Sequence, residues 1–269
     1  MLFSEPDLLR ELYCALEGVS LPPDAPVSIN TLEDVLFMEF INDISFEIDG
    51  KLVVLIEHQS TINQNIALRL LMYIARVYEK TLEGKNIYSG KKLHVPQPEF
   101  FVLYNGTAYC EDQQIIRLSA SFEKLKSLGL EEKDAPALEL VVKVLNINEG
   151  RNKEIAARCK KLAEYSAFIA KVRDFERELG NKEEAVKSAI KYCGKHDILN
   201  EFLQLHATEV LSMLMTEWNM DDALAVRYDE GREEEREIIA RNALAEGLMP
   251  EFVHKITGLD LETIRELRN

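Results

Sequence analysis

The chain has 269 residues, of which 46% are hydrophobic and 29% are charged, and its formal net charge is −15. This length is enough to bury a core without disulfides or structural metals, and the composition is typical of a globular protein. The strong negative charge argues against a protein that coats nucleic acid non-specifically. No apolar run is long enough to cross a bilayer and the N-terminus has no signal-peptide pattern, so we expect no membrane partner and a cytoplasmic location.

The charge is distributed unevenly along the chain. Residues 1–50 carry one Arg against eleven Asp and Glu, and residues 201–269 carry seven basic against sixteen acidic side chains. Two interior blocks are mildly basic, with seven against four in residues 51–100 and twelve against eight in residues 151–200. We therefore expect any bound DNA to approach the basic middle of the chain and not its ends.

The four cysteines are too far apart to form a CxxC motif. They are Cys14, Cys110, Cys159 and Cys193. In a reducing cytoplasm, such isolated cysteines are expected to be free thiols, neither disulfide-bonded nor part of a zinc site.

The first segments predict a helix and then a β-hairpin. Residues 6–17 have apolar side chains at helical spacing, and residues 18–29 form a Pro-rich loop. Residues 44–48 alternate between apolar and polar side chains, which predicts a strand with one polar face. Leu52 to Ile56 are all apolar, which predicts a central strand covered on both faces, and Asp49-Gly50 predicts the turn between the strands.

Residues 65–83 give the clearest helical pattern of the chain. The apolar side chains expected to face the core are Leu68, Leu71, Met72, Ala75 and Leu82. A second stripe at helical spacing consists of Arg69, Tyr73, Arg76 and Lys80. This stripe either receives phosphates and stacks on a base or sugar, or is simply a solvated helix face.

The rest of the chain predicts two further strands and then helices alone. Residues 99–104 and 138–147 read as strands, so the first part, which also holds a long helix, is α/β. Helices are expected over 151–178, 182–193, 197–217 and 227–246. We divide the chain into an α/β domain over 1–150, a helical region over 151–226 and C-terminal helices over 227–269.

The C-terminal tail has the outline of a helix-turn-helix, with Gly258 in the turn. Its second helix carries several acidic side chains, which are poor partners for phosphate. We therefore favour packing or oligomer formation over DNA reading for this segment, and we expect a homo-oligomer, a dimer, formed through the helical C-terminal half.

The predicted hairpin carries the residues best suited to chemistry. Two carboxylates held close together can bind Mg²⁺ or another divalent cation, which assists phosphodiester hydrolysis. Asp43 and Glu57 are the candidates, and Gln59 points to the same side of its strand as Glu57. The carbonyl of His58 is a possible third ligand, while its imidazole should point away. A Glu and a Gln that end an apolar strand can also simply mark where that strand meets solvent.

The length of the hairpin turn tests the metal hypothesis. A two-residue turn would pair Asp43 with Ile56 and place Asp43 on the opposite face from Glu57. A connection with an odd number of residues, for instance with Gly50 in the left-handed region, would place both carboxylates on one face. The metal hypothesis therefore requires an odd connection or a bulge.

Several segments resemble a known family. They are NTLEDVLFMEFINDISF, VLIEHQSTINQNIALRLLMYIARVYEK, PEFFVLYNG, LELVVKVLNIN and the C-terminal AEGLMPEFVHKITGLDLETIREL. Together they resemble the recombination-promoting nuclease/putative transposase family (Rpn), a branch of the PD-(D/E)XK nucleases, over nearly the whole chain. The resemblance implies a restriction-endonuclease-like core in residues 1–150, metal-dependent cleavage of DNA, and a link to recombination, mobile elements or phage defence.

The resemblance also assigns roles to residues. It matches Asp43 and Glu57 to the acidic pair, Gln59 to the position that the wider superfamily fills with Lys, and Arg69 to the arginine of the following helix. A further acidic ligand could come from Glu33, Asp34 or Glu39, among which the sequence does not choose. The alternative hypothesis is a catalytically inactive, transposase-derived protein that acts through interaction and oligomerisation, which the acidic surface and Gln59 favour.

Overall fold

The computed structural model describes residues 2–3, 5–29, 44–129 and 136–267. The chain divides into two compact units, residues 1–211 and residues 212–269. Among the described residues, the first unit contains the whole β-sheet and five complete helices. The second consists of helices alone.

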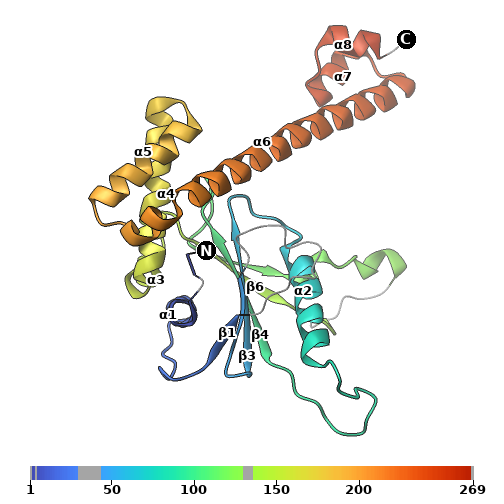
Figure 1. Cartoon of the computed structure of the whole chain (residues 1–269). Helices are drawn as coiled ribbons and strands as arrows, with labels where there is room; N and C mark the ends of the chain where they lie inside the picture. Colours follow the sequence, from blue (N-terminus) through green and yellow to red (C-terminus); the bar gives the residue numbers. More distant parts are fainter. Residues whose placement is uncertain (1, 4, 30–43, 130–135, 268–269) are drawn as a thin grey trace. The chain divides into compact units, whose positions relative to one another are not determined.

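The first unit is an α/β fold with a mixed six-stranded sheet (Figure 1). Its strands are β1 (Val27–Ile29), β2 (Ile44–Ile48), β3 (Leu52–Gln59), β4 (Gln97–Tyr104), β5 (Gln113–Arg117) and β6 (Val141–Asn146). Their spatial order is β1-β2-β3-β4-β6-β5. The central pairs β3–β4 and β4–β6 are parallel, and all the other pairs are antiparallel. This mixed sheet with flanking helices, followed by a helical region, is consistent with the predicted restriction-endonuclease-like class.

The helices begin before the sheet and dominate after it. They are α1 (Pro6–Glu17), α2 (Ile66–Thr81), α3 (Lys153–Arg158), α4 (Lys160–Leu179), α5 (Lys182–Lys195), α6 (Asn200–Ala245), α7 (Pro250–Thr257) and α8 (Leu261–Glu266). Helix α1 has the bounds that the apolar spacing predicts and ends at Gly18, whose φ of 69° lies in the left-handed region that favours glycine.

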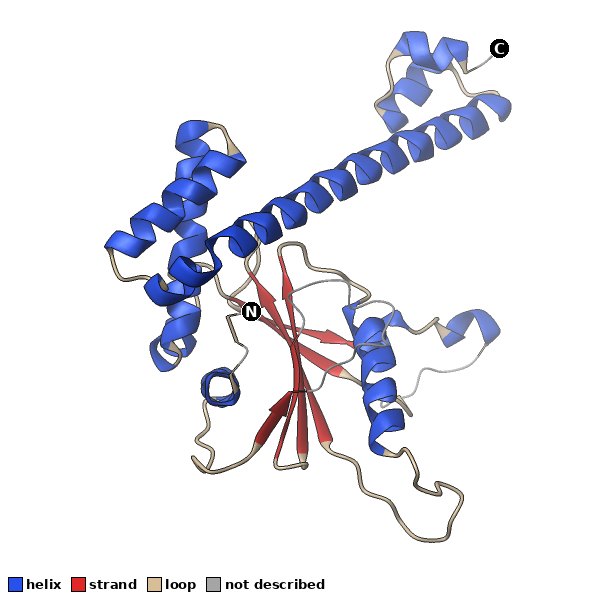
Figure 2. Ribbon diagram, viewed as in Figure 1, coloured by secondary structure: helices blue, strands red, loops and turns tan. Residues whose placement is uncertain are grey.

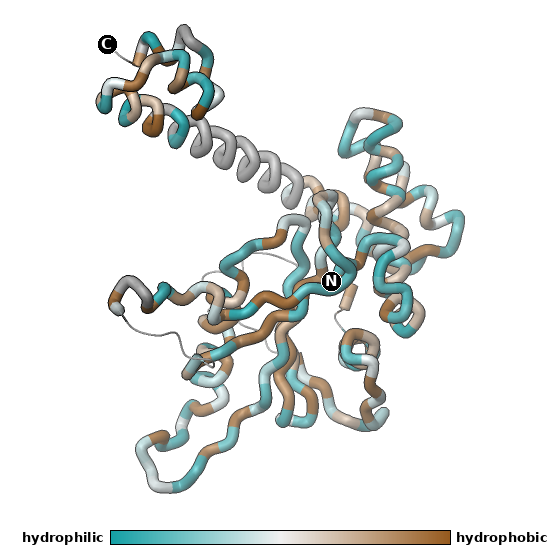
Figure 3. The backbone as a smooth tube through the Cα atoms, turned by 180° about the vertical axis from the view of Figure 1, so that it is seen from behind, coloured by the Kyte–Doolittle hydropathy of each residue, from teal (hydrophilic) through white to brown (hydrophobic). Residues whose placement is uncertain are grey.

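Helices cover both faces of the sheet (Figure 2). On one face, α1, α3 and the start of α4 pack on strand residues such as Phe46, Ile56 and Phe101. On the other face, α2 packs on residues such as Val53 and Leu55. Strand β3 is therefore apolar on both sides and central, as its sequence predicts. Figure 3, which colours each residue by its hydropathy, shows hydrophobic residues along the strands of the sheet.

The β2–β3 connection has the odd length that the metal hypothesis requires. Ile48 pairs with Leu52 and Ile44 with Ile56, so three residues, 49–51, connect the strands. Asp49 and Gly50 have φ values of 51° and 59°, and the amide of Lys51 donates to the carbonyl of Ile48 at 3.1 Å. The expected left-handed Gly50 is confirmed, and the two-residue turn is excluded.

The predicted core face of α2 is wrong by a rotation of about one residue. The buried side chains are Ile66, Ala67, Leu70, Tyr73, Ile74 and Val77. Of the predicted face, Leu68 and Leu71 are only half-buried and Met72 is 60% exposed. Apolar residues occupy most of the circumference of this helix, so periodicity alone did not fix its rotation. Tyr73 is consequently a core residue and not part of an exposed stripe.

Three further features differ from the sequence prediction. Strands β1 and β5 lie at the two edges of the sheet and were not predicted. Both are short, and β5 alternates between exposed and half-buried residues, so neither has a continuous apolar signal. The two helices predicted over 197–217 and 227–246 form one helix, α6, with a kink at His206.

The second unit has a small core of its own. Ala240, Ala243, Val253, Leu259 and Ile264 bury their side chains together. The two short helices predicted here are confirmed as α7 and α8, and Gly258 ends α7 with a φ of 71°. In the described part of the chain, no helix combines the length and the apolar character that a membrane span needs. All four cysteines are free thiols, as expected.

Candidate active site at the end of strand β3

The carboxylate of Glu57 is the centre of a polar cluster between β3 and α2. Its side chain is 3% exposed and lies on the same face of the sheet as Val53 and Leu55, which α2 covers. Its Oε2 accepts a hydrogen bond from Nε2 of Gln59 at 2.9 Å. Its Oε1 lies 3.4 Å from Nη2 of Arg69 and has no hydrogen-bond partner among the described residues. The structure thus brings three of the predicted site residues together.

The surroundings of Glu57 act on its ionisation in opposite directions. Burial raises the pKa of the carboxyl, because the charged form loses hydration, while Arg69 and the Gln59 amide lower it. Burial has the larger effect, so the pKa is raised overall. A buried carboxylate with one unbonded oxygen would gain from any further positive charge that reached it.

Gln59 is held by the loop that leads into α2. The amide N–H of Asn63 donates to Oε1 of Gln59 at 3.2 Å, and the side chain of Asn63 accepts from the amide of Asn65 at 2.8 Å. Both ends of the Gln59 amide therefore have a partner, which fixes its orientation with Nε2 toward Glu57. Asn63 was not among the predicted site residues, although it belongs to the segment that carries the family resemblance.

Arg69 connects the cluster to the core of α2. Its Nη2 donates to the hydroxyl of Tyr73 at 3.2 Å, and its guanidinium carbon lies 5.9 Å from the centre of the Tyr73 ring. Arg69 is only partly buried, with 31% of its side chain exposed. Tyr73 therefore positions Arg69 from inside the core and offers no surface for stacking on a base.

His58 points to the opposite face of the sheet, as the alternation of the strand predicts. Its Nε2 lies 3.0 Å from the hydroxyl of Tyr165 in α4, and the two rings meet edge to face with centres 5.5 Å apart. Asn105 donates to the same hydroxyl at 3.4 Å. Tyr165 was not predicted, because it lies 107 residues from His58 in sequence.

The buried His58 makes stability depend on pH. Burial, and secondarily the charge of Arg173, lowers the pKa of His58 from 6.5 to about 4. The unfolded chain therefore binds a proton before the folded one, and stability is lost as the pH falls from about 6.5 toward 4. The loss amounts to roughly 3 kcal/mol at most. Urea denaturation at pH 7, 6 and 5 measures it.

The variant His58→Gln is expected to flatten this pH dependence. The matched control is His94→Gln at an exposed position, which should leave the slope unchanged. An equal slope for wild type and His58→Gln would show that His58 does not stay neutral in the folded protein.

The ends of β3 and β4 are in direct backbone contact. The amide of Asn105 donates to the carbonyl of Gln59 at 3.1 Å. A Cβ atom on Gly106 would lie 1.7 Å from the carbonyl oxygen of Ser60 and 2.5 Å from the Tyr104 hydroxyl. Only glycine allows this approach.

We accordingly expect Gly106→Ala to lower the free energy of unfolding by about 2 kcal/mol or more, because backbone must move to accept the methyl group. Gly90→Ala is the control, since nothing lies within 4 Å of a Cβ there. Chemical denaturation of both variants checks the expectation. Equal stabilities would mean that the β3–β4 junction is not tightly packed.

The remaining predicted ligands fall outside the described residues. They are Asp43, Glu33, Asp34 and Glu39. In the part of the chain that the structure describes, no three His, Cys, Asp or Glu side chains gather closely enough to hold a metal ion. Glu57 nevertheless suits one ligand position, because its buried Oε1 lacks a hydrogen bond. The described residues therefore fit one side of a metal site.

Comparison with known proteins identifies the segment that contains this cluster. Residues 30–114 match the family model described as putative transposase, YhgA-like. This segment, which is less than half of the chain, is similar to that family. The match spans β2, β3, α2 and β4, and hence Glu57, Gln59 and Arg69. The YhgA-like family is part of the Rpn, PD-(D/E)XK-like family, which confirms the resemblance seen in the sequence. No curated protein and no solved structure matches the chain.

Proposed function

We propose that the protein is a divalent-metal-dependent endodeoxyribonuclease that hydrolyses phosphodiester bonds in DNA. The observation that carries the proposal is the buried Glu57, with one unbonded carboxylate oxygen, held between Gln59 and Arg69 in the segment of the family match. The family of putative transposases is consistent with a nuclease-like role.

The residues have distinct roles in this proposal. The side chains of Asp43 and Glu57, with the carbonyl of His58, would hold Mg²⁺ or another divalent cation. The cation would supply positive charge that polarises the phosphate and favours loss of a proton from water. Gln59 orients the attacking water, and Arg69 offsets negative charge on the phosphate.

The odd β2–β3 connection supports the place of Asp43 in this scheme, because only that register allows Asp43 and Glu57 to share a face. The opposite direction of the His58 imidazole leaves its carbonyl as the group that could serve the site.

Plasmid cleavage tests the proposal. Supercoiled DNA is incubated with the protein in Mg²⁺ and in EDTA, and the same assay is run on Asp43→Ala and Glu57→Ala. Cleavage is expected in Mg²⁺ only and from the wild type only. Cleavage that survives both substitutions would show that the site is elsewhere.

A second candidate function is a non-catalytic role in interaction and oligomerisation. It is favoured by the ion pair of Glu57 with Arg69, which gives the buried carboxylate a counter-charge without a metal. Exposed apolar residues at the start and along one side of α7, namely Met249, Phe252 and Ile256, also suit contact with another copy. Absence of metal binding in calorimetry, together with an oligomer in light scattering, would favour this function over cleavage.

A further inference from the structure

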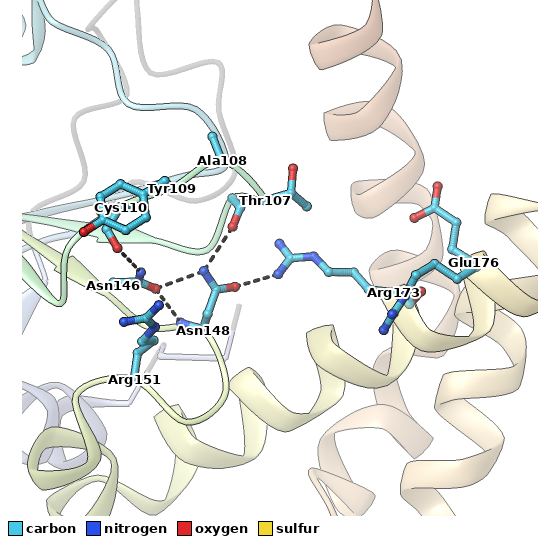
Figure 4. A pocket seen from close by; sticks show the side chains of 11 residues that line it. Thr107, Ala108, Tyr109, Cys110, Asn146, Asn148, Arg151, Arg173 and Glu176 are labelled. Atoms are coloured by element: carbon cyan, nitrogen blue, oxygen red, sulfur yellow. Dashed lines mark hydrogen bonds between the residues drawn. The ribbon is translucent and has the colours of Figure 1, made fainter.

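A second polar site lies beside the candidate active site, at the carboxyl ends of β4 and β6. It is a pocket of about 650 Å³ within the first unit. The loop after β4, the end of β6 and helix α4 line it, and Figure 4 shows their side chains converging from these three elements. Its lining includes the arginines Arg151, Arg173 and Arg177, and one carboxylate, Glu176.

The inner wall of the pocket is rigidly built. Arg173 donates to Oδ1 of Asn148 at 2.6 Å and also to the carbonyl of Asn105. The side-chain amide of Asn148 donates to the carbonyl of Gly106 at 3.0 Å. The side-chain amide of the buried Asn146 donates to the carbonyl of Cys110 at 2.9 Å. This network, visible in Figure 4, fixes the shape of the pocket before any ligand arrives.

The outer rim offers donors that a phosphate can recruit. Arg151 pairs with Asp112 at 2.9 Å and Arg177 pairs with Asp174 at 2.6 Å, and the two arginine side chains are 49% and 78% exposed. Each of these bonds uses a single nitrogen, while a guanidinium has five N–H donors. Exposed ion pairs contribute little stability. A phosphate that accepts two hydrogen bonds from one guanidinium can therefore compete with the carboxylates for these arginines.

An aromatic side chain completes the rim. Tyr109 is 85% exposed and belongs to the pocket lining, across from Arg173 in Figure 4. Its ring is therefore accessible to a ligand. Nucleic-acid sites that follow a single strand commonly combine basic groups with an aromatic surface on which a base stacks.

The loop that lines the pocket contacts the end of the strand that carries Glu57. Its first lining residue, Gly106, touches the carbonyl of Ser60, and Asn105 is hydrogen-bonded to Gln59. Tyr165 and Asn105 further tie His58 to the same loop. A nucleic-acid strand held in the pocket would therefore run directly past the end of β3.

We propose that this pocket binds a phosphate and the adjoining base of a nucleic-acid strand, with Arg151 and Arg177 on the phosphate and Tyr109 stacked on the base. The inference rests on the proposed nuclease function, for which the pocket would be a site that holds the DNA substrate. The three arginines belong to the basic block of residues 151–200, which is where the charge distribution places an approach of DNA.

Binding without cleavage tests the inference. Fluorescence anisotropy of a labelled single-stranded oligodeoxynucleotide is measured in EDTA, at several salt concentrations. The double variant Arg151→Gln/Arg177→Gln is expected to weaken binding at least about fivefold and to lower the logarithmic slope of the salt dependence by about 0.7, because the contact with one phosphate is lost. The control is Arg117→Gln. Arg117 is another exposed arginine paired with a carboxylate, but it lies at the end of β5 and does not line the pocket.

A second variant separates stacking from charge. Tyr109→Ala is expected to weaken binding of the single strand about fivefold or more without changing the salt dependence. Tyr88→Ala, at another exposed tyrosine, should have no effect. Unchanged affinity and salt dependence in the arginine double variant would overturn the inference, as would full competition by free adenosine 5′-monophosphate below millimolar concentration. These binding measurements do not depend on cleavage. A failure of the proposed nuclease function in the plasmid assay can therefore be distinguished from a failure of this inference.

Discussion

The variant Glu57→Gln is expected to lose at least about a hundredfold in the rate of DNA cleavage while remaining folded. A metal ion contributes several kcal/mol of charge stabilisation in such reactions, and each 1.4 kcal/mol corresponds to a factor of ten. The amide has nearly the size of the carboxylate and can still accept from Gln59, but it cannot bring the negative charge that holds a cation. Plasmid cleavage under single-turnover conditions measures the loss.

The stability of this variant distinguishes a lost ligand from a lost fold. The carboxylate of Glu57 is buried and its pKa is raised by burial, so ionisation is costly in the folded protein. The partner left behind, Arg69, is 31% exposed and can be hydrated. We therefore expect the free energy of unfolding to change by about 1 kcal/mol or less. Loss of cleavage together with wild-type stability and reduced affinity for Mg²⁺ in calorimetry is the expected combination, and full activity would contradict the proposed site.

Local patterns predicted where strands β2 and β3 lie in the chain, although the expected polar face of β2 is buried at Ser45. The alternating residues of β2 and the continuously apolar β3 left little choice of role, and both are where the sequence places them. The rotation of α2 could not be predicted in the same way, because Leu68, Leu71 and Met72 compete with the residues that are buried. The packing of α2 on the sheet decides among them, and that packing is a tertiary property.

The candidate site was predictable to the extent that it is local. Glu57 and Gln59 are two residues apart on one strand, and Arg69 follows on the next helix, so strand geometry and the family resemblance sufficed. The side chains that hold the same strand end from the other face, Tyr165 and Asn105, come from distant segments. No spacing rule connects residues so far apart, and the pocket that they border could be found only in the folded chain.

The largest effect on stability is expected at Arg69. Replacing it by Met would leave the carboxylate of Glu57 buried without a counter-charge, which costs about 3 kcal/mol, at the lower end for a broken buried pair because Arg69 is partly exposed. The loss of Glu57 and the loss of Arg69 are thus expected to change stability by different amounts. Removing Glu57 leaves a charge that water can reach, whereas removing Arg69 leaves one that water cannot reach. Urea denaturation at pH 7 measures the difference.

Two comparisons test whether this loss comes from the charge of Glu57 and not from lost packing of the Arg69 side chain. In Glu57→Gln/Arg69→Met no unpaired charge remains, so stability should return to within about 1 kcal/mol of Glu57→Gln alone. The single variant Arg69→Met should also be less destabilised at pH 5 than at pH 8. Loss of Arg69 raises the pKa of Glu57 further, so the folded state takes up a proton that the unfolded state does not, and stability falls as the pH rises. An equally unstable double variant with no pH dependence would show instead that Arg69 acts through its packing on Tyr73.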